Sequence, residues 1–560
     1  MSELSIRFGQ VDPVAKQDIV DIIVTPIKPW SVIDNLRFDG VPVPPNYATN
    51  EHNFSILDGS KQHFPDEVSP LTTFGFWSEG VSDDFGSFGD SPPTLDIYFG
   101  ANHKSLGVTY YFYPHTDDYA NRIRVTWYDS SNTIIHTGEY PQTSNLAIVS
   151  QSVLDYRRIK TEFLSTNIRN RFIKLYAIDF GIIRTFYDAE ISSCYINEEI
   201  DPTVKTLSIN TMNAKIRTRN SIFSPIMSEN FDDMMMKRQL MQVYKDSVLY
   251  GAFFLTKWKD SKRSGIEFSV DTEDAISIFD LYAFTGGLYI RKPAIDLLNE
   301  LFGIVFPTGL IGYQIDPSLS DSTVTGWIPS GTCGEALQHI LFAIHAIADT
   351  SRREYIWIYD RDTVSTLNIP LERQYRKGQD EPTEYFSGVE VISYSYTPGT
   401  EVRQLFKDVL TVGRHRISFR NPMHSLEVTE ATIIESHVNY AILVVPVETE
   451  VLLEGSVYIE NQQSHIVREE VTAGEIDALK KFDDFTLVSP ETADYLAQKQ
   501  FELLHYRIKS TTDIALDDKE VGYVATMETK GRSLEGLITG LDIDLRANSA
   551  EMVVIGNAVT

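Results

Sequence analysis

The pattern of hydrophobic and polar positions predicts mainly β structure along most of the chain. Between residues 51 and 182, short runs rich in β-branched and aromatic residues alternate with turn-rich stretches. The runs lie at 94–99 (TLDIYF), 107–113 (GVTYYFY), 123–128 (IRVTWY), 133–136, 156–163 and 172–178 (FIKLYAI). Many short strands at this spacing, with no convincing helix between them, predict a β-sandwich or jelly roll over 51–182.

The remaining residues divide into four parts. Residues 1–50 hold extended pieces broken by prolines, too few to fold alone, and we assign them as N-terminal strands of a barrel completed further along the chain. Residues 183–285 return to strands and are consistent with a small β-barrel. Residues 286–370 read as a small α/β domain, and 371–560 as a C-terminal β-rich domain. The predicted fold class is therefore mainly β and multidomain.

Three segments carry the helical period instead. The predicted helices span 292–302, 333–347 and 491–507, each with apolar residues on one face. Thr332 is the expected N-cap of the second helix, and Glu335, three residues on, completes a capping-box signature. A strand at 354–359 (EYIWIY) is expected to complete this α/β unit.

Composition narrows the possible functions. In 560 residues, Asp and Glu number 78 against 49 Lys and Arg, a formal charge of −29. Such a surface repels phosphate, so we expect neither general nucleic-acid binding nor adhesion to anionic lipid. No apolar run approaches the ~18 residues of a membrane span. The N-terminus has no basic and apolar signal regions, so we expect synthesis in the host cytoplasm.

Motifs for catalysis or metal binding do not stand out. The 12 histidines form no H-x-x-x-H or H-E-x-x-H pattern, and neither a G-x-S-x-G elbow nor a phosphate-binding glycine loop is present. Cys194 and Cys333 are expected to be buried and inert. Basic clusters at 257–263 and 414–420 are short and read as solvated faces, or less readily as subunit contacts. We therefore expect no enzyme activity, no cofactor and no metal.

Two series of residues carry a resemblance to known families. The first runs through 199–202 (EIDP), 206–211 (TLSINT), 266–270, 280–281, 284–289 (FTGGLY), 313–319 (YQIDPSL), 326–329 (GWIP), 332–337 (TCGEAL) and 348–352 (ADTSR). This series resembles the tail-hub proteins of phages and prophages of Gram-positive bacteria, distant relatives of the contractile-phage baseplate hub. The resemblance covers 196–370 well and 386–560 more loosely.

The second series lies at 54–60 (FSILDGS), 73–78 (TFGFWS), 95–99, 108–114 (VTYYFYP), 123–128 and 171–181 (RFIKLYAIDFG). It is similar to the galactose-binding-like jelly rolls found inserted in such hub proteins. The resemblance thus implies hub-type β-barrel domains interrupted by an inserted jelly roll at 51–182.

The resemblance also implies a role and partners. Tail hubs are typically homotrimers that adapt a hexameric tail tube to a threefold tip. The implied protein is a structural virion component at the baseplate or tail tip, in contact with a distal-tail or tube ring, the tape measure and a spike or tip protein. No peptidase, lysozyme or LysM pattern extends the hub pattern, so we expect no cell-wall degradation.

Host-surface carbohydrate is the candidate ligand of the insert. Two of its loops combine aromatic rings with planar polar groups, the chemistry that binds sugars. The candidate glycan-binding residues are Asp58, His63, His115, Asp118 and Tyr119. The alternative is a glycan-processing enzyme with the jelly roll as an accessory module, which the missing secretion signal disfavours.

Overall fold

The structure is a computed structural model. It describes residues 3–12, 15, 18–25, 76–78, 80–112, 118–218, 239–260, 266–307, 311–362, 366–470, 478–516, 519–529 and 532–559. Strands make up 62% of it and helices 11%, so the predicted mainly β, multidomain fold class is confirmed. The chain forms two compact units, Arg7–Thr185 and Met1–Ile6 with Phe186–Thr560, called the insert unit and the hub unit below.

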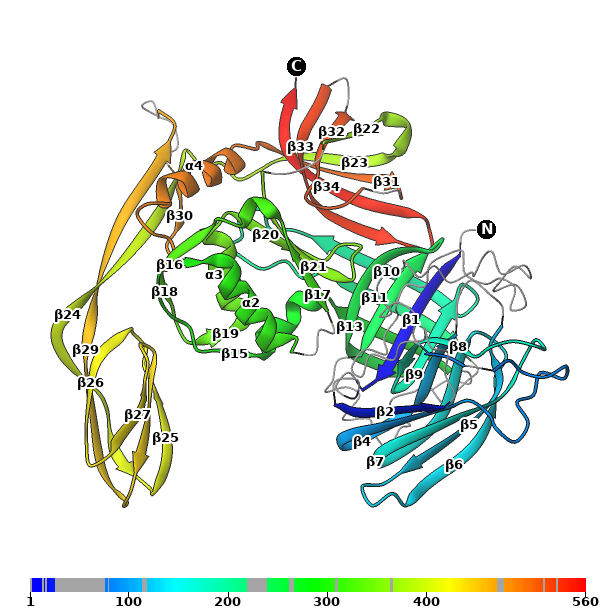
Figure 1. The fold of residues 1–560 in the computed structure, drawn as a ribbon. Helices are drawn as coiled ribbons and strands as arrows, with labels where there is room; N and C mark the ends of the chain where they lie inside the picture. The colour runs from blue at the N-terminus through cyan, green and yellow to red at the C-terminus, as the bar shows by residue number, and fades with distance from the viewer. Residues whose placement is uncertain are drawn as a thin grey trace, which may run out of the picture. The chain divides into compact units, whose positions relative to one another are not determined.

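The insert unit is one antiparallel sheet folded around an aromatic core (Figure 1). Its order is β3-β8-β4-β7-β5-β6, with β2 also paired to β4. The strands are β2 (Ile19–Thr25), β3 (Phe76–Trp77), β4 (Thr94–Phe112), β5 (Ala120–Tyr128), β6 (Ile134–Pro141), β7 (Leu146–Thr166) and β8 (Lys174–Asp179). Alternate residues of β4 and β5, such as Phe99 and Trp127, point inward and are buried. The jelly-roll assignment for this unit stays a prediction.

The long strands β4 and β7 bend where their register shifts. Three shifts interrupt their pairing between Tyr98 and Gly107. Gly107 has φ +149°, and a Cβ there would lie 1.8 Å from the carbonyl oxygen of Val149, so the close approach requires glycine.

A buried histidine ties the start of the insert unit to this bend. His103 lies between two carboxylates, with Nδ1 3.1 Å from Asp12 Oδ2 and Nε2 2.7 Å from Asp18 Oδ2. Burial by itself would lower the pKa of His103, but the hydrogen bonds to Asp12 and Asp18 outweigh it and raise the pKa. The imidazolium form therefore stabilises this contact.

The N-terminal strands divide between the two sheets. Strand β1 (Leu4–Val11) joins the large sheet between β9 and β12, as expected of a hub strand, whereas β2 pairs with β4 of the insert unit. This differs from the prediction, in which both strands belong to the hub barrel. Sequence pattern could not separate them, because a short strand's partner is set by long-range pairing.

The large sheet of the hub unit has thirteen strands, in the order β23-β31-β34-β33-β10-β11-β14-β13-β12-β1-β9, with β32 also paired to β33 and β22 paired to β32. The strands not yet given are β9 (Gly181–Tyr187), β10 (Ile191–Glu199), β11 (Thr211–Thr218), β12 (Leu240–Lys245), β13 (Val248–Asp260), β14 (Ile266–Glu273), β22 (Thr366–Ile369), β23 (Gln374–Pro382), β31 (Ile508–Ala515), β32 (Val524–Thr529), β33 (Arg532–Asp544) and β34 (Ser549–Val559). The pairing of β10 with β33 joins the parts predicted as a small β-barrel (183–285) and as a C-terminal β-rich domain (371–560). The pairings of the described residues trace an open path and close no barrel.

The α/β part confirms the predicted helices. Helices α2 (Ala294–Val305) and α3 (Cys333–Ala343) pack together beside β20 (Ala346–Asp349) and β21 (Tyr355–Asp360), and Thr332 and Glu335 form the capping box. Helix α3 ends four residues before the predicted Ile347, because His345 has φ +57° and turns the chain into β20. Cys194 and Cys333 are buried, which raises the pKa of their thiols to about 12 and about 11.

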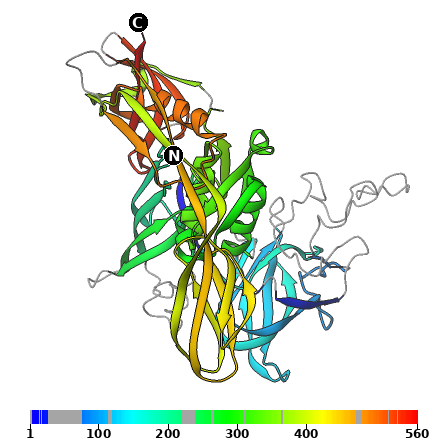
Figure 2. The ribbon, with the colours of Figure 1, turned by 90° about the vertical axis from the view of Figure 1, so that its left-hand side faces the viewer.

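A long hairpin, β24 (Gly388–Leu410) with β29 (Thr449–Arg468), extends from this region (Figure 2). Its far half packs with β25 (Gly413–Ser418), β26 (Met423–Thr429), β27 (Thr432–Ser436) and β28 (Tyr440–Val445) around a separate core. Helix α4 (Ala493–Leu504), within the predicted 491–507, packs on the near half. None of the helices in the described ranges is long and apolar enough to span a membrane.

Candidate functional site

The hub-like sequence series converges on a buried ion-pair network. Arg352 follows β20, and its Nε lies 3.3 Å from Oε1 of Glu198 on β10, with side-chain exposures of 7% and 1%. Arg353 bridges two further acids, with its guanidinium nitrogens 2.9 Å from Asp349 Oδ2 and 2.8 Å from Glu520 Oε2. Three buried carboxylates, those of Glu198, Asp349 and Glu520, are therefore paired with arginines inside the fold.

Hydrogen bonds extend this network. The Asp274 carboxylate accepts the backbone N–H of Asn210 at 2.8 Å, the Thr350 hydroxyl at 2.6 Å and the backbone N–H of Ile276 at 3.0 Å. The Asn210 amide donates to the hydroxyls of Thr350 and Ser351, both at 3.1 Å. Asn210, Thr350 and Ser351 all belong to the resemblance series, so these residues join β11 to the segment after β20.

The acids of the network titrate higher than usual. Burial raises the pKa of Glu198 from 4.5 to about 7, although the Arg352 charge opposes the rise, and burial likewise raises that of Asp274 to about 7. Burial also raises the pKa values of Asp349 and Glu520 against the charge of Arg353. In all four acids burial therefore disfavours the charged form, and the neighbouring arginines offset this only in part.

A second buried contact joins the hairpin to the α/β part. The side chain of Asn439, before β28, accepts the indole N–H of Trp327 at 2.7 Å and donates to the carbonyl oxygens of Thr285 and Ile328 at 2.7 and 2.9 Å. Gly286 has φ +66°, and a Cβ there would lie 2.1 Å from the Ile328 oxygen. The GG and GWIP segments of the series thus form one side of a structural joint.

The near half of the hairpin holds a Ser–His–Asp set. Ser393 Oγ on β24 lies 3.0 Å from His465 Nε2 on β29, and His465 Nδ1 lies 2.7 Å from Asp494 Oδ1 on α4. The order of contacts is that of a hydrolase triad. However, Ser393 is fully buried while the Asp494 side chain is 87% exposed, so substrate cannot reach the hydroxyl. These hydrogen bonds hold α4 against the hairpin. The sequence contains no local motif for the set, because its three residues come from distant segments.

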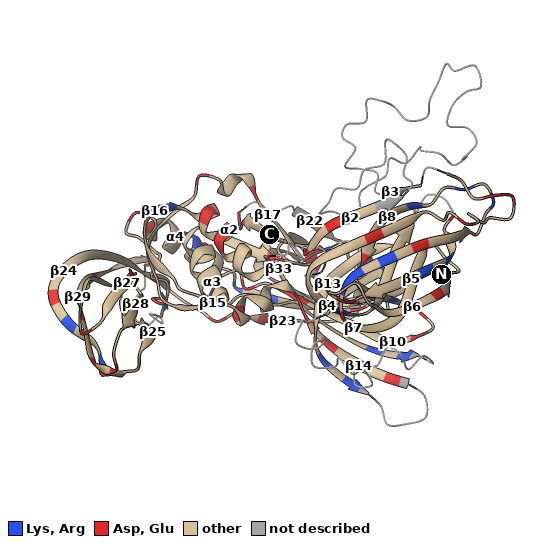
Figure 3. Cartoon of the chain, turned by 60° about the horizontal axis from the view of Figure 1, so that its bottom comes forward, with Lys and Arg blue, Asp and Glu red and all other residues tan. Residues whose placement is uncertain are grey.

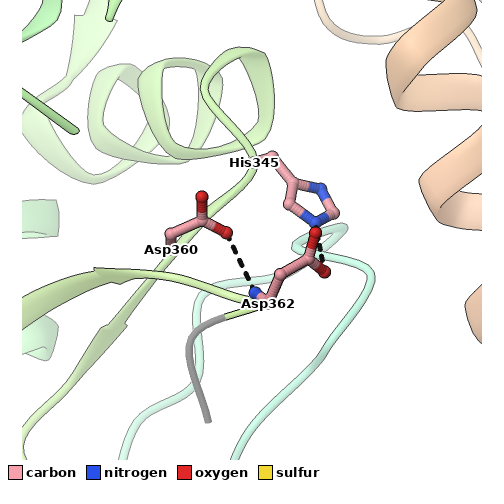
Figure 4. Close-up of side chains that lie close together, drawn as sticks. All are labelled: His345, Asp360 and Asp362. Atoms are coloured by element: carbon pink, nitrogen blue, oxygen red, sulfur yellow. Dashed lines mark hydrogen bonds and ion pairs between the residues drawn. The ribbon is translucent and has the colours of Figure 1, made fainter. Parts of the chain in front are cut away.

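A histidine and two aspartates lie close together after α3 (Figure 4). His345 Nδ1 is 3.1 Å from a guanidinium nitrogen of Arg361, and Nε2 is 3.3 Å from Asp362 Oδ1. Since Arg361 can only donate, the neutral ring carries its proton on Nε2, where a metal would need a lone pair. Lys499 also lies 2.6 Å from Asp362 Oδ2, and Asp360 accepts the Asp362 backbone N–H. The cluster is an ion-pair network and fits a metal poorly.

No family model matches the chain, and no curated protein matches it. Solved structures similar to it include tail proteins. The 43 kDa tail protein of prophage MuSo2 from Shewanella oneidensis is 10% identical, with 65% of this chain and 94% of that chain covered and a TM-score of 0.39. A tail protein from Neisseria meningitidis MC58 is 10% identical, with 67% of this chain and 94% of that chain covered and a TM-score of 0.40. The prophage tail protein gp18 from Listeria monocytogenes EGD-e is 9% identical, with 67% of this chain and 92% of that chain covered and a TM-score of 0.36. TM-scores below 0.5 do not establish a shared overall fold, so the function proposed below rests on the chain's own residues.

The predicted glycan-binding residues fall partly outside the described residues. Asp58, His63 and His115 all lie there. Asp118 and Tyr119 are described, and both precede β5 at one end of the insert sheet. The structure therefore places two of the five candidate residues.

Asp118 is not presented at the surface as the sequence interpretation assumed. Its carboxylate lies 3.0 Å from the Lys174 ammonium, and the two side chains are 3% and 1% exposed. The reason is that a buried lysine on β8 requires a counter-charge. Tyr119 packs its ring partly against the core and donates its backbone N–H to Asn167 Oδ1 at 2.8 Å.

Proposed function

We propose that the chain is a structural hub of a phage or phage-tail-like particle, at the baseplate or tail tip, linking the tail tube to the tip. The observation that carries this proposal is the residue series at 199–352 that resembles tail hubs of phages with Gram-positive hosts. Residues of that series, including Asn210, Trp327 and Arg352, make buried contacts that hold the hub unit together. The residues of the series therefore stabilise the fold, as expected of a structural hub protein.

The chemistry of the described residues favours assembly over catalysis. The buried acids Glu198, Asp349 and Glu520 are paired with arginines, and the buried hydroxyl of Ser393 has no access to substrate. The large sheet of the described residues ends at β23 and β9, and cyclic assembly is the ordinary way to cover strand edges without open-ended growth. We therefore propose a homotrimer in contact with the tube ring, tape measure and tip proteins.

The insert unit is proposed to bind host-surface carbohydrate. In this proposal Asp58, His63, His115 and Tyr119 contact the sugar, while the buried Asp118–Lys174 pair fixes the backbone next to Tyr119. Particles carrying Tyr119→Ala and His115→Ala would then assemble normally and adsorb less.

Deletion of the gene from a producing strain tests the hub role. We expect particles without completed tails, restored by the intact chain supplied in trans, and a trimer of the purified chain or of the chain in particles. Complete, infectious particles without the chain would contradict the proposal.

A further inference from the structure

The outward face of the insert sheet carries an aromatic row. Tyr98 on β4 is paired in register with Arg158 on β7, which is paired in turn with Tyr128 on β5. The guanidinium carbon of Arg158 lies 4.8 Å from the Tyr98 ring centroid and 4.4 Å from the Tyr128 ring centroid. Both distances are within cation–π range, so one cation holds two rings in place.

Arg158 is itself held by two polar neighbours. Its Nε and one terminal nitrogen donate to the two oxygens of Asp96 at 2.8 and 2.6 Å, a bidentate pair with side chains 19% and 12% exposed. Its other terminal nitrogen donates to Asn132 Oδ1 at 3.1 Å. Asn132 lies in the β5–β6 turn with φ +61°. The row is therefore ordered before any ligand arrives.

Several polar groups of the row remain unused. Three of the five N–H groups of Arg158 are bonded, which leaves two. The side-chain amide nitrogen of Asn132 and the Tyr128 hydroxyl make no hydrogen bond in the described part of the chain. Ring surface, amide, hydroxyl and guanidinium N–H lie together on a partly exposed face, a set that can both donate to and accept from hydroxyl groups.

Most of the charges flanking the row are paired, whereas Asp21 on β2, in register with Tyr98, makes no ion pair among the described residues. The guanidinium nitrogens of Arg124 lie 2.5 Å from Oε1 of Glu139 and 3.5 Å from Oε2 of Glu162. The Nζ of Lys160 lies 3.6 Å from Oε1 of Glu162. Figure 3 shows both signs of charge on these strands. Because charges of both signs are mixed on this face, it offers no strong local attraction to a polyanion or a polycation, which leaves a neutral polar ligand as the best fit.

We propose that this row, Tyr98, Arg158 and Tyr128 with Asp96 and Asn132, is a binding subsite for a neutral hexose unit of a cell-surface glycan. The proposal rests on the function proposed above and adds a contact on the sheet face to the contacts proposed there. A sugar presents C–H groups to a tyrosine ring and hydroxyls to the Arg158, Asn132 and Tyr128 polar groups. Because these side chains are already ordered, binding loses little side-chain entropy.

The test compares the full chain with variants of the row on purified neutral wall polysaccharide and on a panel of hexoses, by calorimetry. Tyr128→Ala with Asn132→Gly removes one ring, its hydroxyl and the amide, and glycine keeps the positive φ. Tyr195→Ala, at a 45% exposed tyrosine of the hub unit, is the matched control. We expect the wild type and the control to bind with similar affinity. The affinity of the double variant should be lower by at least about tenfold.

Asn132→Gly alone is the milder variant should the double variant fold poorly, and circular dichroism checks both. Equal binding by wild type and folded variants would overturn the subsite while leaving glycan recognition by the insert standing. Absence of neutral-glycan binding by the wild-type chain would overturn it as well. Incorporation of each variant into tails, scored separately, tests the hub role independently of either result.

Discussion

Replacing Asn439 by alanine should loosen the joint between the hairpin and the α/β part. The side chain is fully buried and makes three hydrogen bonds, to the Trp327 indole and to the carbonyl oxygens of Thr285 and Ile328. Alanine leaves one buried donor and two acceptors without this partner. Each unsatisfied buried group costs ~1–3 kcal/mol. Partial relaxation and water entry recover some of this, so we expect about 3–5 kcal/mol of lost stability at the joint.

Hydrogen–deuterium exchange followed by mass spectrometry measures this loss locally, which matters because a multidomain chain does not unfold in one step. Peptides covering 284–290, 326–330 and 436–442 should exchange faster in Asn439→Ala, while those of the insert unit stay unchanged. Asn439→Asp keeps the acceptor for Trp327 but removes the donors and buries a charge, so it should be at least as damaging.

Asn461→Ala, at an exposed position of the same hairpin, is the control and should exchange as the wild type does. Exchange in Asn439→Ala that is indistinguishable from wild type in all three peptides would refute the reasoning. It would mean that the hydrogen bonds are not formed in solution or that the joint is held by other contacts.

Three further changes have defined outcomes. The raised pKa of Glu198 makes the folded state lose stability as the pH rises from about 4.5 through about 7. In calorimetric melts, Glu198→Gln should reduce this loss of stability by on the order of 3 kcal/mol. An unchanged pH dependence in the variant would contradict the raised pKa. Because the pKa of His103 is raised, its imidazolium form stabilises the folded state fully below pH 6.5, and this stabilisation is lost as the pH rises through the raised pKa. His103→Gln should therefore lower the melting temperature more at pH 6 than at pH 9. An equal loss at both pH values would contradict the imidazolium contact. Leu337→Asp buries an unpaired charge in α3 and should cost about 4 kcal/mol or more by thermal melting, whereas Leu281→Asp, at a 58% exposed leucine, should melt like wild type; a stable Leu337→Asp protein would show the helix packing to be wrong.

Local signals made parts of the fold predictable. The capping box of Thr332 and Glu335 and the apolar stripe with Leu337 depend on residues within a few positions of each other, and the helix appeared where they indicated. The strands of the insert followed from alternation for the same reason. The helix ends were predicted less accurately: α2 runs to Val305 and not to 302, and α3 ends at Ala343 because His345 adopts a positive φ that its residue type does not indicate.

Long-range pairings could not be predicted. The division of β1 and β2 between two sheets, the pairing of β10 with β33, and the contact of Ser393 with His465 and Asp494 all join segments far apart in the sequence. The sequence also placed Asp118 at a loop surface, since the buried charge of Lys174 that draws it inward lies on another strand. Residue types identified candidate chemistry, but burial decided which groups a ligand can reach.

Immunogold electron microscopy of purified particles tests the central claim most directly. With antibody raised against the chain, the account predicts label confined to the tail tip or baseplate, and three copies per particle by quantitative mass spectrometry. Particles with complete tails that carry no label, while the chain remains in the unassembled fraction of the lysate, would contradict it.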